Sequence, residues 1–403
     1  MNRRLKKTLF VLVSAMVMMF AMSICAFAGT PADLTQIGVS ETGIQVQWTD
    51  ATASPSVKEY YGIQVATDPN FANVVKTNYE IDTTRGTVYG LTAGNSYYVR
   101  VGCGTDYKNC FTQNLCTAII CATAPTAPAE AAFIDANDTT ATISWTPSAG
   151  ATSYIIAYAN NEQIAFETTA TSYALPIVAD LYDSVRIYAC RTNGAGVRCT
   201  DNYKYFSGFS GLTTKLTSEQ YGVQYFYSSS RKVEIGAAGY QGTAFDVQLA
   251  PVKGKGTKEK SAKQYQSYID MGKLKANTMY KYRVRAYVTL SNGTKKTGSW
   301  SDYRYMVSTT AKGGRTYGGI KIVLPKMSGV NKAVISVSTK KDKGYKKCAT
   351  ISGLTKSKTY VIKKYGKKAL KKRTSYYVKV EYYAGKKAST MSDIYGSLSV
   401  YYY

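Results

Sequence analysis

Histidine, the side chain that most often acts as a general base or a metal ligand, is absent from all 403 residues of this chain. No motif of a serine hydrolase, a zinc protease, a phosphate-binding P-loop or a dinucleotide fold is present. The 25 acidic residues show no spacing typical of the paired carboxylates of a glycosidase. The sequence therefore predicts that the protein is not an enzyme and has no catalytic residue, no cofactor and no metal site.

Cysteine is the remaining residue type whose spacing points to covalent chemistry. Four of the eight cysteines lie in one expected hairpin, as two pairs centred on almost the same point, as cross-strand partners must be. Two more flank an Asn-Gly turn. In an exported protein such pairs indicate disulfide bonds, and a metal site formed by the four hairpin cysteines is the alternative. The predicted bonds are Cys103–Cys121, Cys110–Cys116 and Cys190–Cys199.

Cys348 is left over in this scheme. We expect it to be a small buried residue, with a bond between two molecules as the alternative. Each predicted disulfide closes only a short loop, so its main effect would be to fix the shape of a loop at the end of a domain. Loops of that kind often carry binding residues.

The first 28 residues have the composition of a secretory signal peptide. A positively charged segment, residues 2–7, precedes an apolar segment, residues 9–20, and Ala26-Phe27-Ala28 forms a cleavage site. We expect the mature protein to begin at Gly29 and to be secreted, and an uncleaved membrane anchor is the alternative. No second apolar run of about 20 residues follows, so no membrane span is expected after cleavage.

The net charge of +26 is distributed unevenly. Counted from the sequence, it is +4 for residues 1–28, −3 for 29–124, −3 for 125–215, +10 for 216–312 and +18 for 313–403. In the mature protein a mildly acidic half is thus followed by a strongly basic half. Such an asymmetry concerns the partners of a protein rather than its fold.

The positive charge is densest in two lysine-rich segments of the last 91 residues. One interpretation is that lysines keep sheet edges from associating. The other is a surface that binds an anionic polymer by diffuse attraction, which suits lysine better than arginine and weakens steeply with salt. Outside a bacterial cell the abundant polyanions are envelope polymers and acidic polysaccharides, so we expect these as partners and no nucleic acid. The candidate residues are Lys340, Lys341, Lys346, Lys347, Lys363, Lys364, Lys367, Lys368, Lys371, Lys372 and Arg373.

The elements that must position these residues are indicated by a repeated pattern. Residues 91–101 read Leu-x-x-Gly-x-x-Tyr-x-Val-x-Val, which describes a turn followed by a strand with one apolar face. The spacing recurs around Tyr280 and Tyr376, and a degenerate copy covers residues 185–190, so the copies are about 86 to 97 residues apart. A second landmark, an alternating strand that ends in Trp48 or Trp145, has a period of 97 residues. Both patterns predict tandem copies of one small β-sandwich.

A tryptophan on the second strand, followed about 40 to 50 residues later by Leu-x-x-Gly-x-x-Tyr-x-Val-x-Val, resembles the fibronectin type III domain. The resemblance extends over residues 30–403 as four copies, of which the last two lack the tryptophan on the second strand. It implies an all-β chain of four antiparallel, immunoglobulin-like β-sandwiches after the signal peptide. The predicted domains are residues 29–124, 125–215, 216–312 and 313–403.

The repeated tyrosine has a structural role in this scheme. Its ring packs beneath the turn and its hydroxyl bonds to backbone a few residues upstream, so a large side chain is buried without an unpaired polar group. The second copy departs from the pattern, because Asp183 stands where tyrosine is expected. Residues 313–319, which are rich in glycine, are expected to form a flexible linker. The predicted core residues are Trp48, Trp145, Leu91, Tyr97, Tyr280 and Tyr376.

Two hypotheses of function follow. In the first, the chain is a secreted, non-catalytic adhesion or scaffold protein. Its basic half, residues 216–403, binds anionic cell-envelope polymers, and its disulfide-braced acidic half contacts a protein partner such as another surface protein. In the alternative, it is a carbohydrate-binding protein of extracellular polysaccharide degradation that acts through exposed tyrosines. Tyrosine rings aligned on one sheet face, and binding that survives high salt, would favour the alternative.

Overall fold

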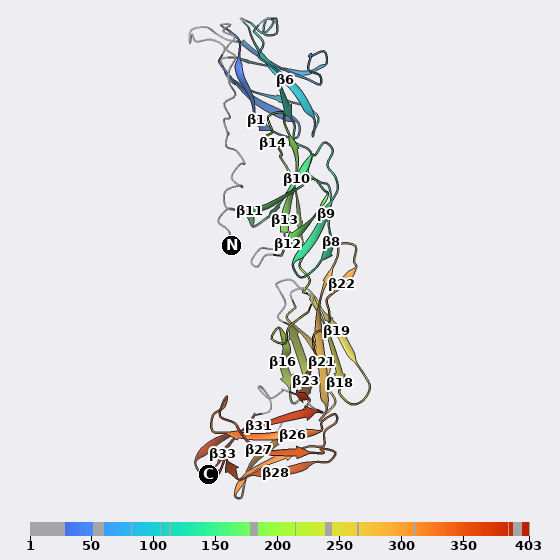
Figure 1. Ribbon diagram of the computed structural model, residues 1–403, viewed down its shortest axis with the longest axis vertical. Helices are drawn as coiled ribbons and strands as arrows, with labels where there is room; N and C mark the ends of the chain where they lie inside the picture. The colour runs from blue at the N-terminus through green and yellow to red at the C-terminus, as the bar shows by residue number, and fades with distance from the viewer. Residues whose placement is uncertain are drawn as a thin grey trace. The chain divides into compact units, whose positions relative to one another are not determined.

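In the computed structural model every regular element of the described residues is a β-strand, which confirms the predicted all-β class (Figure 1). The described residues are 29–50, 60–81, 83–104, 106–112, 114–177, 184–213, 215–237, 244–263, 266–309, 312–385, 387–389 and 397–402. The predicted signal peptide and the irregular corner at Asp183 lie outside them. Within these ranges no helix is long and apolar enough to cross a membrane.

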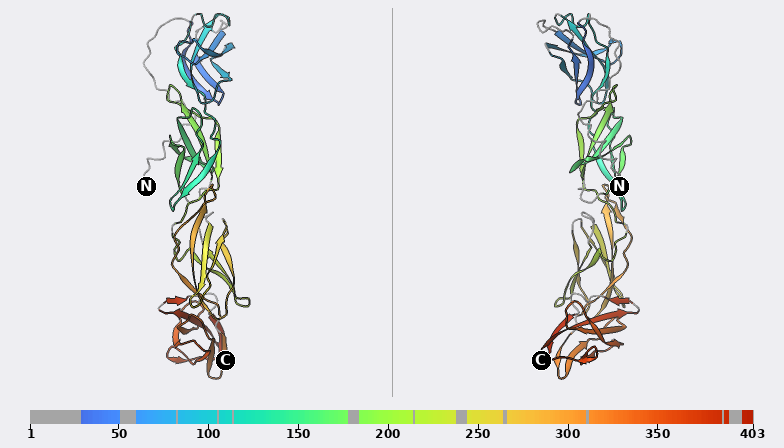
Figure 2. Two further views of the ribbon diagram at one scale, coloured as in Figure 1. Left: turned by 90° about the vertical axis from the view of Figure 1, so that its right-hand side faces the viewer. Right: turned by 60° about the vertical axis from the view of Figure 1, so that its left-hand side comes forward.

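The strands of the described residues form four pairs of sheets and one separate two-stranded sheet, and we call the pairs the first to fourth sandwiches (Figures 1 and 2). The sandwiches belong to two compact units. The first unit contains the described residues up to Asp135 together with Thr140–Phe209, and the second contains Ala136–Thr139 and the described residues from Ser210 onward. The predicted domain boundaries, near residues 124, 215 and 312, remain predictions.

The first unit contains two sandwiches of the same design. The strands of the first sandwich are β1 (Ala32–Val39), β2 (Gly43–Thr49), β3 (Tyr60–Ala66), β4 (Val74–Ile81), β5 (Arg85–Tyr89), β6 (Ser96–Gly104) and β7 (Ile119–Ala122). They form the sheets β1-β2-β5 and β4-β3-β6-β7. The strands of the second sandwich are β8 (Ala131–Ala136), β9 (Thr140–Trp145), β10 (Ser153–Tyr158), β11 (Asn161–Thr168), β12 (Ser172–Pro176), β13 (Ser184–Thr192), β14 (Arg198–Cys199) and β15 (Tyr203–Ser207). They form the sheets β12-β9-β8 and β11-β10-β13-β14, with β15 also on β13.

The second unit repeats the design twice. The strands of the third sandwich are β16 (Tyr221–Tyr227), β17 (Lys232–Ala237), β18 (Ala244–Pro251), β19 (Lys258–Ala262), β20 (Tyr268–Lys273), β21 (Met279–Thr289), β22 (Lys295–Thr297) and β23 (Arg304–Val307). Those of the fourth are β24 (Lys312–Thr316), β25 (Gly319–Leu324), β26 (Lys332–Ser338), β27 (Lys346–Ser352), β28 (Lys358–Ile362), β29 (Lys364–Tyr365), β30 (Lys368–Ala369), β31 (Thr374–Ala384), β32 (Lys387–Ser389) and β33 (Ser397–Tyr402). One continuous apolar cluster contains the core residues of both sandwiches.

The predicted core residues are buried. Side chains of β2 alternate between buried and partly buried up to Trp48, which is 2% exposed, and Leu91 is also buried. The Trp48 ring lies 5.2 Å from the ring of Tyr61, and the second sandwich repeats this pair with Trp145 and Tyr154 at 5.4 Å. Alternation along a strand thus places one apolar face inside each sandwich.

The three described corner tyrosines are buried, and each accepts a hydrogen bond of the same kind from the backbone. In each case the N–H group of the residue five positions earlier donates to the phenolic oxygen. The donors and acceptors are Thr92 and Tyr97 (3.0 Å), Lys275 and Tyr280 (2.9 Å), and Lys371 and Tyr376 (2.8 Å). The residue three positions before each tyrosine has a positive φ: 66° at Gly94, 50° at Asn277 and 55° at Arg373. This left-handed turn explains the glycine of the first copy, because glycine adopts it without strain.

The predicted disulfide bond between Cys103 and Cys121 is wrong, because β6 and β7 pair in another register. Cys121 lies opposite Tyr97, near the start of β6. The N–H group of Cys116 donates to the carbonyl oxygen of Val101 at 2.9 Å, which shifts the register by only one residue. The hairpin is therefore centred several residues before the midpoint that the spacing indicated. No disulfide bond joins cysteines within the described ranges.

The predicted bond between Cys110 and Cys116 is absent as well. The thiol of Cys110 donates to the carbonyl oxygen of Tyr60 at 3.1 Å. The sulfur of Cys116 instead accepts a hydrogen bond from the N–H group of Val101 at 3.1 Å. Each sulfur atom thus forms a hydrogen bond with a backbone group, and the two sulfur atoms are not bonded to each other.

The loop after β6 is held by close packing on glycines rather than by disulfides. A Cβ atom at Gly62 would lie 2.3 Å from the ring of Phe111, and one at Gly102 would lie 1.8 Å from the carbonyl oxygen of Cys110. Real Cβ atoms do not approach other atoms so closely, so a side chain at Gly102 would displace the backbone of the loop and one at Gly62 would displace the ring of Phe111. The restraint that we expected from covalent bonds therefore comes from van der Waals contact.

The predicted bond between Cys190 and Cys199 is absent because the register of the two strands does not place these cysteines opposite each other. Cys199 lies opposite Arg191 on β13. Residues directly opposite each other in a sheet point to the same face, while neighbours along a strand point to opposite faces. Cys190 therefore points away from Cys199. Arg191 itself donates to the hydroxyl oxygen of Ser96 at 3.0 Å, so its face is turned toward the first sandwich.

Burial keeps these thiols protonated. It raises the pKa of Cys121 to about 12 and the pKa values of Cys190 and Cys199 to about 11. Because the thiolate is the nucleophile, burial makes these three cysteines less reactive at neutral pH. Cys348 is partly buried against the core of the second unit.

The prediction that residues 313–319 form a flexible linker is wrong. They form most of the hairpin β24–β25, in which Thr316 pairs with Gly319. Gly318 has a φ of 73° in the turn, and a Cβ atom at Gly313 would lie 2.3 Å from the carbonyl oxygen of Lys321. The glycines therefore serve a tight turn and a close backbone approach, which composition alone does not distinguish from flexibility.

Candidate polyanion-binding surface

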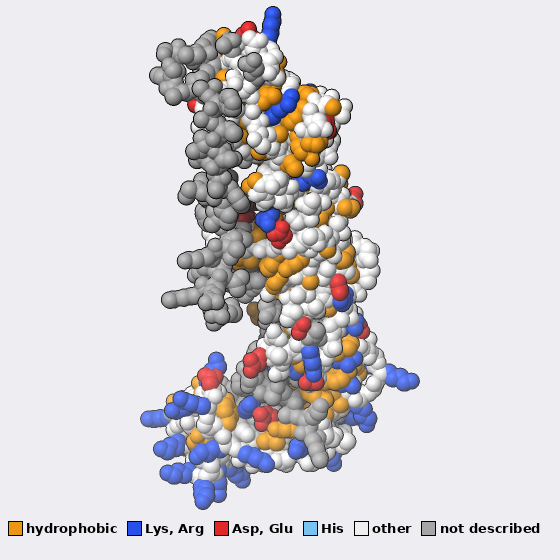
Figure 3. Space-filling model, turned by 45° about the horizontal axis from the view of Figure 1, so that its top comes forward, with side chains coloured by type: hydrophobic (Ala, Val, Ile, Leu, Met, Phe, Trp, Pro, Cys, Tyr) orange, Lys and Arg blue, Asp and Glu red, His pale blue; other side chains and the backbone are white. Residues whose placement is uncertain are grey.

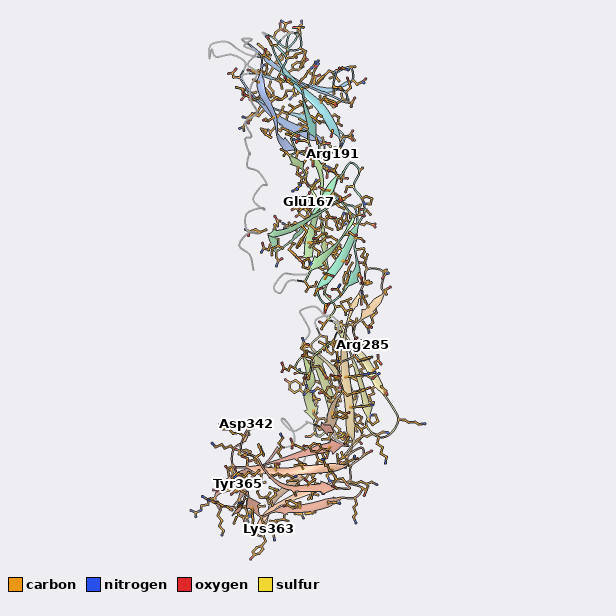
Figure 4. The ribbon with its side chains drawn as sticks, in the orientation of Figure 1. Glu167, Arg191, Arg285, Asp342, Lys363 and Tyr365 are labelled. Carbon is orange, nitrogen blue, oxygen red and sulfur yellow. The ribbon has the colours of Figure 1, made fainter. Side chains whose placement is uncertain are left out.

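The two lysine-rich segments meet at one side of the fourth sandwich, although β28 separates them in the sequence. The first, residues 340–347, follows β26 and enters β27. The second, residues 363–373, connects β28 to β31 and contains the short hairpin β29–β30. Strand β27 contacts β29, and Figure 4 shows Asp342 of the first segment on the same side as Tyr365 of the second.

Tyr365 joins the two segments. Its hydroxyl donates to the carbonyl oxygen of Gly344 at 3.0 Å, and the ammonium nitrogen of Lys346 lies 4.7 Å from its ring centroid, in a cation–π contact. Its ring also packs edge-on against Tyr376 at 6.3 Å. Gly366 allows this approach, since a Cβ atom there would lie 2.9 Å from Cδ of Lys346. The buried corner tyrosine thus anchors the ring that holds both segments.

All eleven candidate cations are exposed. Within the described ranges none of them forms an ion pair. The described acids of the fourth sandwich are Asp342 and Glu381, and Glu381 is paired with Lys379 at 3.2 Å. Figure 3 shows Lys and Arg side chains standing out from this sandwich, at the lower left of the view. The surface therefore carries an uncompensated positive potential that an external anion can meet.

Arg373 has a backbone conformation that residues with a side chain rarely adopt. Its φ is 55°, at the position where the first copy has Gly94. Such a conformation costs about 1–2 kcal/mol for a residue other than glycine. Asn277 has the same conformation in the third sandwich, so the strain belongs to the corner turn, and in the fourth sandwich it falls on a cation.

Replacing Arg373 by glycine is expected to stabilise the fourth sandwich by about 1 kcal/mol, because glycine adopts a positive φ without strain. The variant should also bind an anionic polymer slightly less well, since one cation is lost. Urea unfolding measures the first effect and titration with inorganic polyphosphate the second. Lys372→Gly, at a neighbouring position without a positive φ, is the control and is expected to destabilise the fold. A destabilised Arg373→Gly variant would contradict the strain argument.

The basic residues of the third sandwich are used differently. Arg283 and Arg285 on β21 lie over the ring of Trp300 at 4.7 and 4.5 Å, and Lys295 lies over Tyr287 at 3.7 Å. The sequence interpretation missed this cluster. The alternation of basic and apolar residues along 281–285 was a signal for it, because period two places the basic residues on one sheet face. Several cations of this sandwich thus contact aromatic rings of the protein itself.

Asp246 neutralises two of these cations from a buried position. It is 1% exposed and accepts hydrogen bonds from Arg285 Nε (2.9 Å), Lys295 Nζ (2.5 Å) and Ser261 Oγ (2.6 Å). Burial alone would raise the pKa of Asp246, but the hydrogen bonds from Lys295, Ser261 and Arg285 hold it below its ordinary value.

No group of three or more metal-ligand side chains occurs in the described part of the chain.

Three tyrosines are exposed on one face of the sheet β16-β17-β20. Tyr225, Tyr227 and Tyr268 are 53%, 47% and 44% exposed, and the first two rings lie 6.3 Å apart at an angle of 31°. Tyr225 lies opposite Glu234 of β17 and Tyr268 lies opposite Gly236, and these two positions share a face. This alignment of rings is what the carbohydrate hypothesis requires, and we call it the tyrosine face.

In a comparison with known proteins, one family model matches the first sandwich. Residues 29–107 match the family model described as Fibronectin type III domain. No curated protein matches the chain in sequence. Among solved structures, the crystal structure of the chicken CNTN1 FN1-FN3 domains matches at 15% identity over 70% of this chain and 99% of that chain, with a TM-score of 0.24. The third and fourth sandwiches share the sheet order and the corner tyrosine of the matched region.

Proposed function

We propose that this tandem fibronectin type III protein is a secreted, non-catalytic adhesion or scaffold protein whose fourth sandwich binds an anionic polymer of the cell envelope. One observation carries the proposal. Two lysine-rich segments are joined at Tyr365, and their exposed cations form no ion pair within the described ranges. A folded protein that gathers like charges in one place accepts mutual repulsion, which an anionic partner would relieve.

The chemistry of the surface favours a polymer with repeated phosphate or carboxylate groups. Lysine is a compact point charge on a flexible stem, so it follows a diffuse array of anions better than it recognises one group by two parallel bonds. Ten of the eleven candidate residues are lysines. The surface is also exposed rather than enclosed, which suits a long chain more than a small anion.

The first two sandwiches are the part that we propose contacts a protein partner. Each carries a net charge of −3 by the predicted boundaries, so neither is attracted to the same polymer. The loop after β6 is packed onto Gly62 and Gly102, which presents it as a fixed surface. In this arrangement the basic end holds the envelope while the acidic end remains free for the partner.

The experiment that tests this function measures binding of the chain from Gly29 onward to isolated cell envelopes and to inorganic polyphosphate at increasing salt. Binding is expected to fall steeply as salt rises, because the screening length shrinks from about 10 Å at 0.1 M to about 3 Å at 1 M. Uncharged dextran is the control, and any binding of it should not depend on salt. Binding of polyphosphate that is indifferent to salt would refute the proposal.

The tyrosine face supports a second candidate, a carbohydrate-binding protein of extracellular polysaccharide degradation. Aromatic rings on an exposed sheet face offer an apolar contact to the C–H face of sugar rings. In that case binding to insoluble polysaccharide would survive high salt and would be lost in Tyr225→Ala and Tyr227→Ala. Retention of binding in both variants would remove this candidate.

A further inference from the structure

A cleft in the first sandwich runs along the open edge where β4 lies next to β5. The two strands are edge strands of different sheets. The volume of the cleft is about 600 Å³, within the range of about 300–1,000 Å³ that is typical of ligand sites. Gly86 of β5 also lines it, and a Cβ atom there would lie 2.3 Å from Cδ1 of the core residue Ile63 and 3.0 Å from Cγ of Glu80, so the two strands approach closely at this glycine. The cleft belongs neither to the lysine-rich surface nor to the tyrosine face.

Besides Lys76 and two threonines, the polar side chains that line the cleft are planar groups with more than one polar atom. Gln45 and Asn78 are amides, Glu80 is a carboxylate and Arg85 is a guanidinium. The amide nitrogen of Asn78 donates to Glu80 Oε1 (3.0 Å) and to the carbonyl oxygen of Thr87 (2.9 Å), which orients the amide. Such groups match pairs of neighbouring hydroxyls, because each hydroxyl donates one hydrogen bond and accepts others.

Tyr89 adds an exposed aromatic ring beside these groups. Its side chain is 68% exposed and lines the cleft. The ring lies against Gly43, where a Cβ atom would be 2.9 Å from Cδ1 of the tyrosine. Because the ring is supported by backbone on one side, it presents apolar surface to the solvent on the other. A sugar ring, with one apolar C–H face and a rim of hydroxyls, fits a ring of this kind beside polar planar groups.

The charges of the cleft favour an uncharged ligand. Lys76 and Arg85 are partly offset by Glu80, so the lining has a net charge of +1, against +18 for residues 313–403. A mostly polar lining also disfavours a lipid or another apolar ligand. Charged side chains at a sheet edge hinder association of edges. That role, however, requires neither an oriented amide nor an exposed ring.

We propose that this cleft binds a segment of a neutral polysaccharide. The ring of Tyr89 stacks on one sugar, and Gln45, Asn78 and Glu80 bind hydroxyls of that sugar or the next. The site is separate from the tyrosine face, and the proposal stands whether or not the fourth sandwich binds polyanions.

The test is calorimetric titration of the chain from Gly29 onward with cellohexaose, xylohexaose, mannohexaose and chitohexaose in high salt. At least one of these is expected to bind saturably. Tyr89→Ala and Asn78→Ala should each lower its affinity by at least about tenfold. Tyr205→Ala, which removes a side chain 54% exposed on β15 of the second sandwich, is the matched control and should bind like the wild type. Thermal unfolding verifies that each variant is folded.

Three outcomes would overturn the proposal. The first is that none of the four hexasaccharides binds to the wild type, and the second is that binding persists unchanged in both cleft variants. The third is loss of binding in Tyr225→Ala with retention in Tyr89→Ala, which would assign the sugar to the tyrosine face. A charge-neutralised fourth sandwich that loses polyphosphate but keeps the hexasaccharide would separate this site from the proposed function.

Discussion

Replacing Lys346, Lys364, Lys367 and Lys368 together by glutamine is expected to weaken binding of inorganic polyphosphate by about a thousandfold at low salt. These side chains lie on the β29–β30 hairpin or against the ring of Tyr365. Each lysine near an anionic surface contributes about 1 kcal/mol, and about 1.4 kcal/mol corresponds to a factor of ten. The dependence of affinity on salt should become shallower in parallel. Titration at several salt concentrations measures both effects.

A matched variant separates the shape of the surface from net charge. Glutamine at four exposed lysines of the third sandwich removes the same charge from the same unit and should cost less than about tenfold in affinity. The control positions are Lys253, Lys255, Lys263 and Lys273. An equal loss in both variants would show that total charge, rather than the junction at Tyr365, attracts the polymer. In that event the candidate site would have to be abandoned.

Replacing Asp246 by asparagine is expected to lower the free energy of unfolding of the second unit by about 3 kcal/mol. The carboxylate is 1% exposed and accepts hydrogen bonds from Arg285 and Lys295. Removing its charge leaves Lys295 without its carboxylate partner and Arg285 with only Glu259, at 3.6 Å, in a partly buried place, which costs more than the loss of an exposed pair. Asp302→Asn is the control, because Asp302 is 91% exposed in its pair with Lys215 and should cost less than about 1 kcal/mol. Denaturant unfolding, followed by tryptophan fluorescence, gives both values.

The contribution of Asp246 should depend on pH in a defined direction. Its pKa in the folded protein is below the ordinary value of 3.8, so the folded state favours the ionised form. The stabilisation is therefore fully present above the pKa of the unfolded state and is lost as pH falls through the folded pKa. We expect the difference in unfolding free energy between wild type and Asp246→Asn to be constant near neutral pH and to shrink below about pH 4. A difference that grows in acid would contradict this assignment.

Features with local causes were predictable from the sequence. The strand that ends at Trp48 follows from alternation alone, because period two puts one face inside. The corner of Tyr97 was predictable for the same reason, since its hydrogen-bond partner is five residues away and the intervening turn has its own sequence signature. The corner of the second copy, where Asp183 stands in place of the tyrosine, lies outside the described residues.

The cysteine pairs show where local reasoning stops. Spacing indicated a hairpin, and a hairpin exists, but the residue opposite Cys121 is Tyr97 rather than Cys103. Register is set by how a whole strand buries its apolar side chains, and a shift of a few residues separates any predicted pair. The prediction for residues 313–319 was wrong for a related reason, because glycine permits both a flexible linker and a tight hairpin.

The sequence by itself determined the repeated all-β design, the buried tryptophans and corner tyrosines, and the concentration of positive charge in the last copy. These depend on periodicity, composition and contacts within a few residues. The tertiary structure alone decided which groups meet: Lys346 with Tyr365, Asp246 with Arg285, and the strands β4 and β5 that flank the cleft. The partners in these contacts come from different strands, and their distance in space is set by sheet order and register, which no local pattern encodes.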